Sequence, residues 1–346
     1  MNIAILTLAG HEFKGGVEKF NSLLAQCLQS GGHTVQLFAF RDIKQSNVER
    51  AFGSLWNKTP YRDVYAAHIM AKEFSKHQKN FDLVIANDFF GLFVEKIKKI
   101  VFLHGYYGEV FNSMRHKISF PYWLWGMELA RVQRMALKNA DLVVTPCRGN
   151  YDYLKKRNLR VDRVIPHGID AEFYKPIAKP DKALDGINLP KDDFLLYVGS
   201  KAPWKNFEMV ERASEDYKVV ALSRKEEGSN ATYLENFPEE SMPALYSKAA
   251  MLLHPSLSEG FGYSVAESMS CGTPALFTMT GFGPELAQEM PELVLENPSD
   301  YTEAKQKISF ILGNRKSLSP RCRKFIEENN SLWKWRKQWL EAVEAV

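Results

Sequence analysis

The sequence predicts an α/β protein with two domains of similar size, each built on a parallel sheet with helices on both faces. The chain has 346 residues, which is more than one domain of about 150 residues accounts for. Short apolar runs alternate with longer amphipathic segments, the pattern of strand–helix–strand units. This alternation weakens once, between residues 170 and 193, where Pro176, Pro180 and Pro190 and alternating Lys and Asp indicate a linker.

The first series of elements is expected within residues 1–170. Its strands are short, rich in β-branched residues and bounded by Gly, Asp or Asn. We expect strands at 2–8, 34–40, 82–86, 100–103, 142–145 and 163–165, and helices at 17–30, 61–79, 126–138 and 149–157.

The second series begins at residue 193, after a linker at 171–192. We expect strands at 194–198, 218–222, 250–253, 274–278 and 293–295, with helices at 206–214, 242–248 and 263–270. Residues 305–346 read as entirely helical. Ligands of such sheets bind at the carboxyl ends of the strands, and two facing domains favour a cleft between them.

The composition is that of a globular protein, with 45% hydrophobic and 25% charged residues and a net charge of +4. This charge is too small to indicate a nucleic-acid partner. The cysteines Cys27, Cys147, Cys271 and Cys322 are too far apart for a zinc or disulfide framework, which favours reduced thiols and a cytoplasmic location. Neither a signal peptide nor a membrane-spanning segment is expected.

The most informative stretch is residues 254–274, His-Pro-Ser-Leu-Ser-Glu-Gly-Phe-Gly-Tyr-Ser-Val-Ala-Glu-Ser-Met-Ser-Cys-Gly-Thr-Pro. Gly260 and Gly262 let the backbone approach a ligand, and the following helix points its free N–H groups at the same place, which favours a phosphate. Glu259 and Glu267 are eight positions apart. The whole string resembles the E-x7-E region of the retaining glycosyltransferases of family 4, which have the two-domain GT-B fold. The alternative is a glycine-rich turn that caps a core helix.

Other pieces of the sequence follow the order of that family. Gly15 and Gly16 look like its Gly-Gly-x-Glu loop, and His104 followed by glycine resembles its His-Gly at the cleft. Residues 165–170 resemble a Pro-Asn-Gly-Ile-Asp segment, with His167 in place of the Asn, so we assign that position no role. Thr-Gly-Phe-Gly-Pro-Glu at 280–285 resembles the family's Gly-Gly-x-Pro-Glu.

The start of the second domain departs from the family pattern. Residues 199–206 resemble Gly-Arg-x-x-x-x-Lys-Gly, and Lys205 matches the lysine, but Ser200 stands where an arginine is usual. Lys201 or Lys205 would then have more of the diphosphate charge to balance. Residues 221–225 replace the usual Gly-x-Gly, and together with 233–237 they are expected near the nucleotide base.

The resemblance implies a role for each matched residue. Lys205 would bind the diphosphate, with Gly15, Gly16, Ser200, Lys201 and Gly260 near the donor. Glu259 would hold hydroxyls of the donor sugar, without acting as a nucleophile, and Glu267 those of the ribose. The backbone N–H groups of Phe261, Gly262, Tyr263 and Ser264 would contact sugar and phosphate, and His104 the donor sugar.

The resemblance implies transfer of a hexose from a nucleoside-diphosphate sugar, with retention of the anomeric configuration, to a glycan or lipid-linked acceptor. Family precedent favours UDP as the carrier. The expected place of the reaction is the synthesis of cell-envelope polysaccharide or lipopolysaccharide. Asp-x-Asp is absent and the histidines lack ligand spacing, so neither a metal nor another cofactor is expected. The resemblance also makes 1–170 the acceptor side and 193–325 the donor domain, with 326–346 crossing back to the first domain.

A segment rich in aromatic residues at 106–125 is the candidate acceptor or membrane contact. It contains Arg115 and Lys117, and aromatic residues with cations are typical of membrane interfaces. Residues 1–176 have 25 basic and 16 acidic groups, whereas 177–300 have 10 and 20. This split suggests a basic acceptor domain at the inner face of an anionic membrane. A plain core or an aromatic acceptor groove is the alternative.

Other functions remain open from the sequence. A dinucleotide-dependent enzyme is disfavoured because no G-x-G-x-x-G follows an expected strand. A sugar-nucleotide epimerase or a glycan phosphorylase would share the architecture. The missing arginine at Ser200 also leaves a catalytically silent scaffold that binds sugar nucleotides, and measurement of donor turnover distinguishes it from a transferase.

Overall fold

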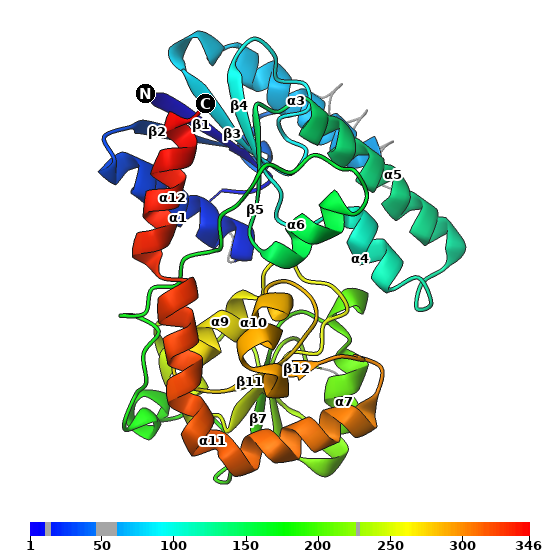
Figure 1. Cartoon of the computed structure of the whole chain (residues 1–346), viewed down its shortest axis with the longest axis vertical. Helices are drawn as coiled ribbons and strands as arrows, with labels where there is room; N and C mark the ends of the chain where they lie inside the picture. Colours follow the sequence, from blue (N-terminus) through cyan, green and yellow to red (C-terminus); the bar gives the residue numbers. More distant parts are fainter. Residues whose placement is uncertain (11–14, 46–60, 226–228) are drawn as a thin grey trace. The chain divides into compact units, whose positions relative to one another are not determined.

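The computed structural model describes residues 1–10, 15–45, 61–225 and 229–346, and the chain divides into two compact units (Figure 1). The N-terminal unit contains Met1–Pro166 together with Trp335–Val346, and the C-terminal unit contains His167–Lys334. Each unit is built on its own parallel sheet, as the alternation of apolar runs and amphipathic segments predicts.

The sheet of the N-terminal unit has six parallel strands in the order β2-β1-β3-β4-β5-β6. Because the strands are parallel, their carboxyl ends meet at one edge of the sheet. The strands are β1 (Asn2–Thr7), β2 (Thr34–Ala39), β3 (Leu83–Asn87), β4 (Lys98–Phe102), β5 (Leu142–Thr145) and β6 (Arg163–Val164). The helices are α1 (Gly16–Ser30), α3 (Tyr61–Ser75), α4 (Tyr107–Ser113), α5 (Phe120–Lys138) and α6 (Arg148–Lys155).

The last helix of the chain, α12 (Leu332–Glu344), completes the core of the N-terminal unit. Trp339 is fully buried, and its ring lies 5.7 Å from that of Phe20 on α1 and 5.5 Å from that of Phe102 on β4. Burial of aromatic rings of this size contributes several kcal/mol. The expected return of the C-terminus to the first domain is therefore confirmed.

The C-terminal unit has a second six-stranded parallel sheet, in the order β12-β11-β10-β7-β8-β9. Its strands are β7 (Leu195–Val198), β8 (Val219–Leu222), β9 (Thr232–Leu234), β10 (Met251–Leu253), β11 (Ala275–Thr278) and β12 (Val294–Leu295). Its helices are α7 (Phe207–Asp216), α8 (Met242–Lys248), α9 (Tyr263–Ser270), α10 (Gly283–Glu289) and α11 (Tyr301–Asn329).

The expectation of one continuous helix over 305–346 is wrong. The helix stops at Asn329, and α12 begins at Leu332. The break coincides with a tertiary contact, because Asn330 bonds to the start of the C-terminal unit. Its carbonyl accepts from the Ile169 N–H at 2.8 Å, and its Nδ2 donates to the His167 carbonyl at 3.2 Å. The expected boundary at residue 326 thus falls inside α11.

Three elements are missing from the sequence-based expectations: α4, β9 and α10. β9 is only three residues long, and α4 falls in the aromatic segment, which has no clear apolar period. Residues 120–125 of α5 fall in the same segment and were not expected to be helical. All four cysteines are buried and form no disulfide. Within the described residues, no helix has the length and apolarity that crossing a membrane requires.

Candidate functional site

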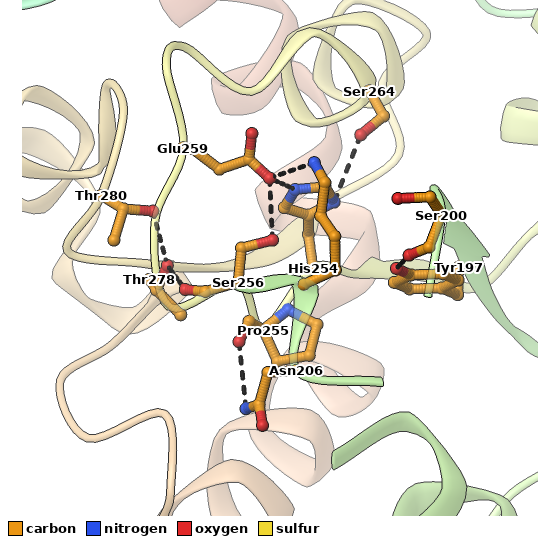
Figure 2. A network of polar contacts seen from close by, with 11 residues as sticks. Tyr197, Ser200, Asn206, His254, Pro255, Ser256, Glu259, Ser264, Thr278 and Thr280 are labelled. Atoms are coloured by element: carbon orange, nitrogen blue, oxygen red, sulfur yellow. Dashed lines mark hydrogen bonds and ion pairs between the residues drawn. The ribbon is translucent and has the colours of Figure 1, made fainter. Parts of the chain in front are cut away.

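The centre of the candidate site is the Glu259 carboxylate, in the loop between β10 and α9. One of its oxygens, Oε1, accepts three hydrogen bonds (Figure 2). The donors are Lys205 Nζ at 2.5 Å, His254 Nε2 at 2.7 Å and Ser256 Oγ at 2.8 Å. The other oxygen, Oε2, has no partner among the described residues. One oxygen therefore fixes the carboxylate, and the other remains available to accept hydrogen bonds from a ligand.

The loop that carries Lys205 is attached directly to the Glu259 loop. Lys205 ends a short 3₁₀ turn, and Asn206 follows with a left-handed φ of 52°, a conformation that asparagine tolerates. The buried Asn206 amide donates to the carbonyls of Pro255 and Pro298, at 3.1 and 2.7 Å. The loops after β7 and β10, 50 residues apart in sequence, are thus held together independently of the ion pair.

Two opposing effects act on the ionisation of Glu259. Burial raises its pKa, but the Lys205 ammonium and His254 lower it by more, so the pKa lies well below its usual range. Burial lowers the pKa of His254, so this imidazole is neutral. Its Nε2–H donates to Glu259, and its Nδ1 accepts from Ser264 Oγ at 3.3 Å. The site therefore contains a permanent carboxylate–ammonium pair and a neutral histidine.

Gly262 and Gly281, near Glu259 in the fold, have no room for a side chain. Gly262, at the N-terminus of α9, has a φ of +108°, and a Cβ there would lie 2.8 Å from the Phe277 ring. At Gly281 a Cβ would lie 2.1 Å from the Phe261 carbonyl oxygen. Gly262 has no side chain that could cap α9, and an uncapped helix N-terminus of this kind favours an anion.

The aromatic residues of this loop pack around His167. The Tyr263 ring stacks on the His167 ring at 4.5 Å, and the Phe261 ring meets it edge-on at 5.0 Å. His167, the departure from the family's asparagine, therefore supports the loop through its ring. Gly260 and Ser264 lie on either side of these aromatic positions, beside Glu259 and at the start of α9.

Glu267 lies in the second turn of α9 and is only 7% exposed. Its Oε2 accepts from the Tyr246 hydroxyl at 2.9 Å, and the Tyr174 hydroxyl also bonds to this carboxylate. Two phenols, from α8 and from the residues after the first domain, thus orient Glu267. No sequence signal indicated these tyrosines.

The two cations of the β7–α7 loop have separate surroundings. The Lys201 ammonium lies 4.4 Å from the centre of the Phe207 ring and 4.5 Å from that of Tyr233, and it donates to the Tyr233 hydroxyl at 3.2 Å. Ser200 is exposed, and its carbonyl accepts from Tyr197 at 2.6 Å. Lys205 contacts Glu259, whereas Lys201 contacts Tyr233 of β9.

A cavity of about 560 Å³ opens between the ends of β8 and β9. Its lining residues come from two short stretches, 222–225 and 234–237, and Arg224 and Lys225 supply positive charge. The Lys225 N–H donates to Glu235 Oε1 at 2.8 Å, which ties the two stretches together. The cavity is large enough for a nucleobase, and its lining residues lie in the two stretches that the family resemblance implies near the base.

The remaining predicted residues, His104, Gly15 and Gly16, belong to the N-terminal unit. His104 follows β4 and is half-buried, with its ring against Phe20 and Phe102. Its Nε2 lies 2.6 Å from Asn87 Oδ1, and burial lowers its pKa to about 3, so it is neutral. Gly15 precedes α1 and Gly16 begins it, both exposed at the edge where β1 ends.

Sequence reasoning assigned no role to several residues that the structure places in these networks. His254 and Ser256 lie inside the motif string, so that string was the available signal. Asp88 follows β3 and carries a left-handed backbone, with a φ of 51°.

Among the described residues, no group of three or more His, Cys, Asp or Glu side chains could hold a metal ion.

Two family models match the chain, one on each side of the linker. The Glycosyltransferase Family 4 model matches residues 14–173, and the Glycosyl transferases group 1 model matches residues 212–331. Together they account for about four fifths of the chain. A curated relative, the O-antigen chain mannosyltransferase B of Escherichia coli, is 41% identical over 54 residues, 16% of this chain and 14% of the relative. The chain spans less than half the length of the curated relatives it matches.

Solved structures match along the whole chain. Sucrose-phosphate synthase from Thermosynechococcus elongatus superposes with a TM-score of 0.80 at 17% identity, covering 99% of this chain and 98% of that one. HepE of Anabaena, in complex with UDP-glucose, has a TM-score of 0.74 at 16% identity, with both chains fully covered. With the two six-stranded parallel sheets, these likenesses confirm the expected two-domain fold.

Proposed function

This chain is a GT-B glycosyltransferase in fold and in the families of both its domains, and we propose that it transfers a hexose from a nucleoside-diphosphate sugar to a glycan or glycolipid acceptor, with retention at the anomeric carbon. The match to an O-antigen mannosyltransferase favours a place in the synthesis of lipopolysaccharide or another cell-envelope polysaccharide. The proposed location is the cytoplasm, at the inner membrane face.

The Lys205–Glu259 pair beside the N-terminus of α9 is the observation that carries this proposal. The Lys205 side chain is 19% exposed and that of Glu259 is 10% exposed, so both charges lie in a water-poor site. An ammonium has three N–H donors, and Lys205 uses one on Glu259. The others, with the N–H groups of Phe261, Gly262, Tyr263 and Ser264, are suited to the negative charge that develops on a leaving diphosphate.

The two carboxylates are assigned to the two sugar rings of the donor. Oε2 of Glu259 accepts hydroxyls of the transferred sugar, because Oε1 is already occupied by three donors. A fixed, ion-paired carboxylate suits this role better than that of a nucleophile. Glu267 accepts the ribose hydroxyls and is oriented by Tyr246 and Tyr174. In the N-terminal unit, the neutral His104 side chain is assigned to the donor sugar, and the backbone of Gly15 and Gly16 is assigned to donor binding.

The cavity between β8 and β9 supports a nucleotide donor. Its volume and position suit a base. The Lys201 ammonium lies between the rings of Phe207 and Tyr233, and Tyr233 belongs to β9, which borders the cavity. HepE binds UDP-glucose, and its likeness to this chain favours UDP as the carrier. Lys205, Lys201 and the α9 N-terminus supply positive charge around the phosphates, so the proposed activity needs no metal ion.

The acceptor side is proposed to contact an anionic membrane through residues 106–125. At the start of α5, Phe120 is 55% exposed, and Tyr122 and Leu124 are also exposed. The Arg115 guanidinium lies over the rings of Phe120 and Trp123, at 5.2 and 4.5 Å. Exposed aromatic residues combined with cations are the chemistry of a membrane–water interface.

A thermal-shift screen with UDP, GDP, ADP and their glucose and mannose conjugates tests the donor assignment. A ligand that binds only the folded chain stabilises it, by about 2.7 kcal/mol at 100 times its dissociation constant. We expect one nucleoside diphosphate and its sugar conjugates to raise the melting temperature, and Lys205→Ala to reduce the shift. Absence of any shift across the panel would contradict the proposed donor.

A further inference from the structure

Asp88 lies at the edge of the N-terminal sheet where ligands of parallel sheets bind. It directly follows β3, and its neighbours at this edge are Asn87 and His104, at the ends of β3 and β4. Its backbone has a left-handed φ of 51°, which costs an aspartate about 1 kcal/mol. The conformation is held by the Asp88 N–H, which donates to the Phe102 carbonyl at 2.9 Å. The chain thus maintains a strained turn that presents this carboxyl.

One oxygen of the Asp88 carboxyl is fixed and the other is not. Oδ1 accepts from the His104 backbone N–H at 3.2 Å and from Gln133 Nε2 at 3.4 Å. Gln133 is itself immobilised, because its Nε2 also donates to the Gly105 carbonyl and its Oε1 accepts from the Tyr107 N–H. Oδ2 has no hydrogen-bond partner among the described residues. The carboxyl is half-buried and oriented, with an oxygen left for a ligand.

Among the described residues, the groups that act on Asp88 are neutral or negative. Asp63 on α3 is the charged group that acts on it most directly, and Asp63 is already paired with Arg62 at 3.0 Å. His104 is neutral, Gln133 on α5 is uncharged, and burial raises the pKa of Tyr107 on α4 far above its usual range. Burial likewise raises the pKa of Asp88 to about 7, and Asp63 adds to this.

These surroundings select the chemistry of the ligand. A phosphate would meet the carboxyls of Asp63 and Asp88, and among the described residues the Arg62 cation beside them is already paired with Asp63, so a phosphate is disfavoured. A hydroxyl group can accept a hydrogen bond from the protonated carboxyl and donate one to the ionised carboxylate. It can therefore bind to Asp88 both below and above neutral pH. Beside Asp88, Asn87 Nδ2 donates to Asn21 Oδ1 at 2.9 Å, which makes the edge a row of uncharged polar side chains.

We propose that the Asp88 carboxyl binds a hydroxyl group of a neutral acceptor sugar and disfavours acceptors that carry a phosphate there. The inference rests on the proposed function in taking the N-terminal unit as the acceptor side. It goes further in naming the residue and the class of acceptor. Asp88 orients this hydroxyl through Oδ2 and takes no covalent part in transfer.

The test is saturation-transfer NMR of the full chain with UDP present, using methyl α-D-mannoside, methyl α-D-glucoside and glucose 6-phosphate as probes. The test variant is Asp88→Asn, since asparagine tolerates the left-handed backbone and keeps an acceptor for His104 and Gln133. The matched control is Asp82→Asn. Asp82 lies at the opposite end of the same strand and likewise accepts a backbone N–H, that of Asn2 at 2.7 Å.

The proposal predicts binding of at least one neutral glycoside by the wild-type chain and by Asp82→Asn. It predicts at least about tenfold weaker binding by Asp88→Asn, and no binding of glucose 6-phosphate. Equal glycoside binding by Asp88→Asn and wild type would overturn it, as would tighter binding of glucose 6-phosphate than of the glycosides. UDP binding in the same samples reports separately on the proposed donor site, because Asp88→Asn leaves the C-terminal unit unchanged.

Discussion

Glu259 in the C-terminal unit and Asp88 in the N-terminal unit are two carboxyls in similar positions with opposite electrostatics. Both lie where strands of a parallel sheet end, and each has one oxygen fixed by donors and one without a partner among the described residues. The difference is the cation. Lys205 holds the pKa of Glu259 below its usual range, whereas burial without a cation raises that of Asp88 to about 7.

On the proposals above, this contrast would let a fold that is used twice in one chain serve two kinds of ligand. A carboxylate that must stay ionised beside a diphosphate needs a permanent positive partner, and that partner also stabilises the leaving group. A carboxyl that binds a neutral hydroxyl needs none and can titrate. The ion pair is therefore a property of the donor site rather than of the fold.

Breaking the pair should have the largest effect on activity. Lys205→Ala and Glu259→Gln are each expected to lower transfer by at least about 10²-fold, the scale of removing one electrostatic stabiliser. The control is Lys248→Ala, which breaks an ion pair with the exposed Asp181 at 2.8 Å, and exposed pairs contribute little. Near-normal rates in both site variants would refute the assignment.

The two units should also differ in their affinity for membranes. Phe120→Ala and Trp123→Ala are expected to weaken co-sedimentation with anionic vesicles by about tenfold, because an inserted aromatic ring contributes one to three kcal/mol. The matched control is Phe310→Ala, since Phe310 is similarly exposed but lies on α11 in the C-terminal unit. If the wild-type chain does not bind vesicles at low salt, the membrane contact is wrong.

The raised pKa of Asp88 predicts a pH dependence of stability. An acid whose pKa is higher in the folded chain than in the unfolded one stabilises the fold at low pH, and this contribution is lost as the pH rises from about 4 through about 7. Asp88→Asn should therefore gain a few °C in melting temperature, relative to wild type, between pH 4.5 and pH 8.

Glu109 provides a comparison for that measurement. Burial raises its pKa to about 7 as well, although Arg157 opposes the shift. Glu109→Gln should thus show a gain in the same direction and pH range. A melting-temperature difference between Asp88→Asn and wild type that does not change with pH would contradict the raised pKa of the Asp88 carboxyl.

The smallest expected effect is that of removing metal ions. Because we propose that Lys205 and the α9 N-terminus neutralise the diphosphate, we expect excess EDTA to leave the transfer rate unchanged within error. The same samples with added Mg²⁺ are the control. Loss of activity in EDTA that Mg²⁺ restores would mean that these groups do not suffice.

The sequence predicted the sheets and the C-terminal part of the site better than the rest. Gly262 and Gly281 occupy positions where a Cβ would clash, and Glu259 and Lys205 have short motifs around them, so local pattern was enough. Asp88, Tyr246 and Tyr174 are single residues brought in by tertiary contacts, without a local signal. The break at Asn330 depends on pairing with residues more than 160 positions away.

The most direct test of the central claim is donor turnover by the wild-type chain and Glu259→Gln. Both are incubated with the nucleotide sugar that gives the largest thermal shift, and release of the nucleoside diphosphate is measured with and without methyl α-D-mannoside. The account predicts release by the wild type, as transfer or slow hydrolysis, reduced at least about 10²-fold in Glu259→Gln. Tight nucleotide binding with neither reaction would contradict it and identify a silent sugar-nucleotide-binding scaffold.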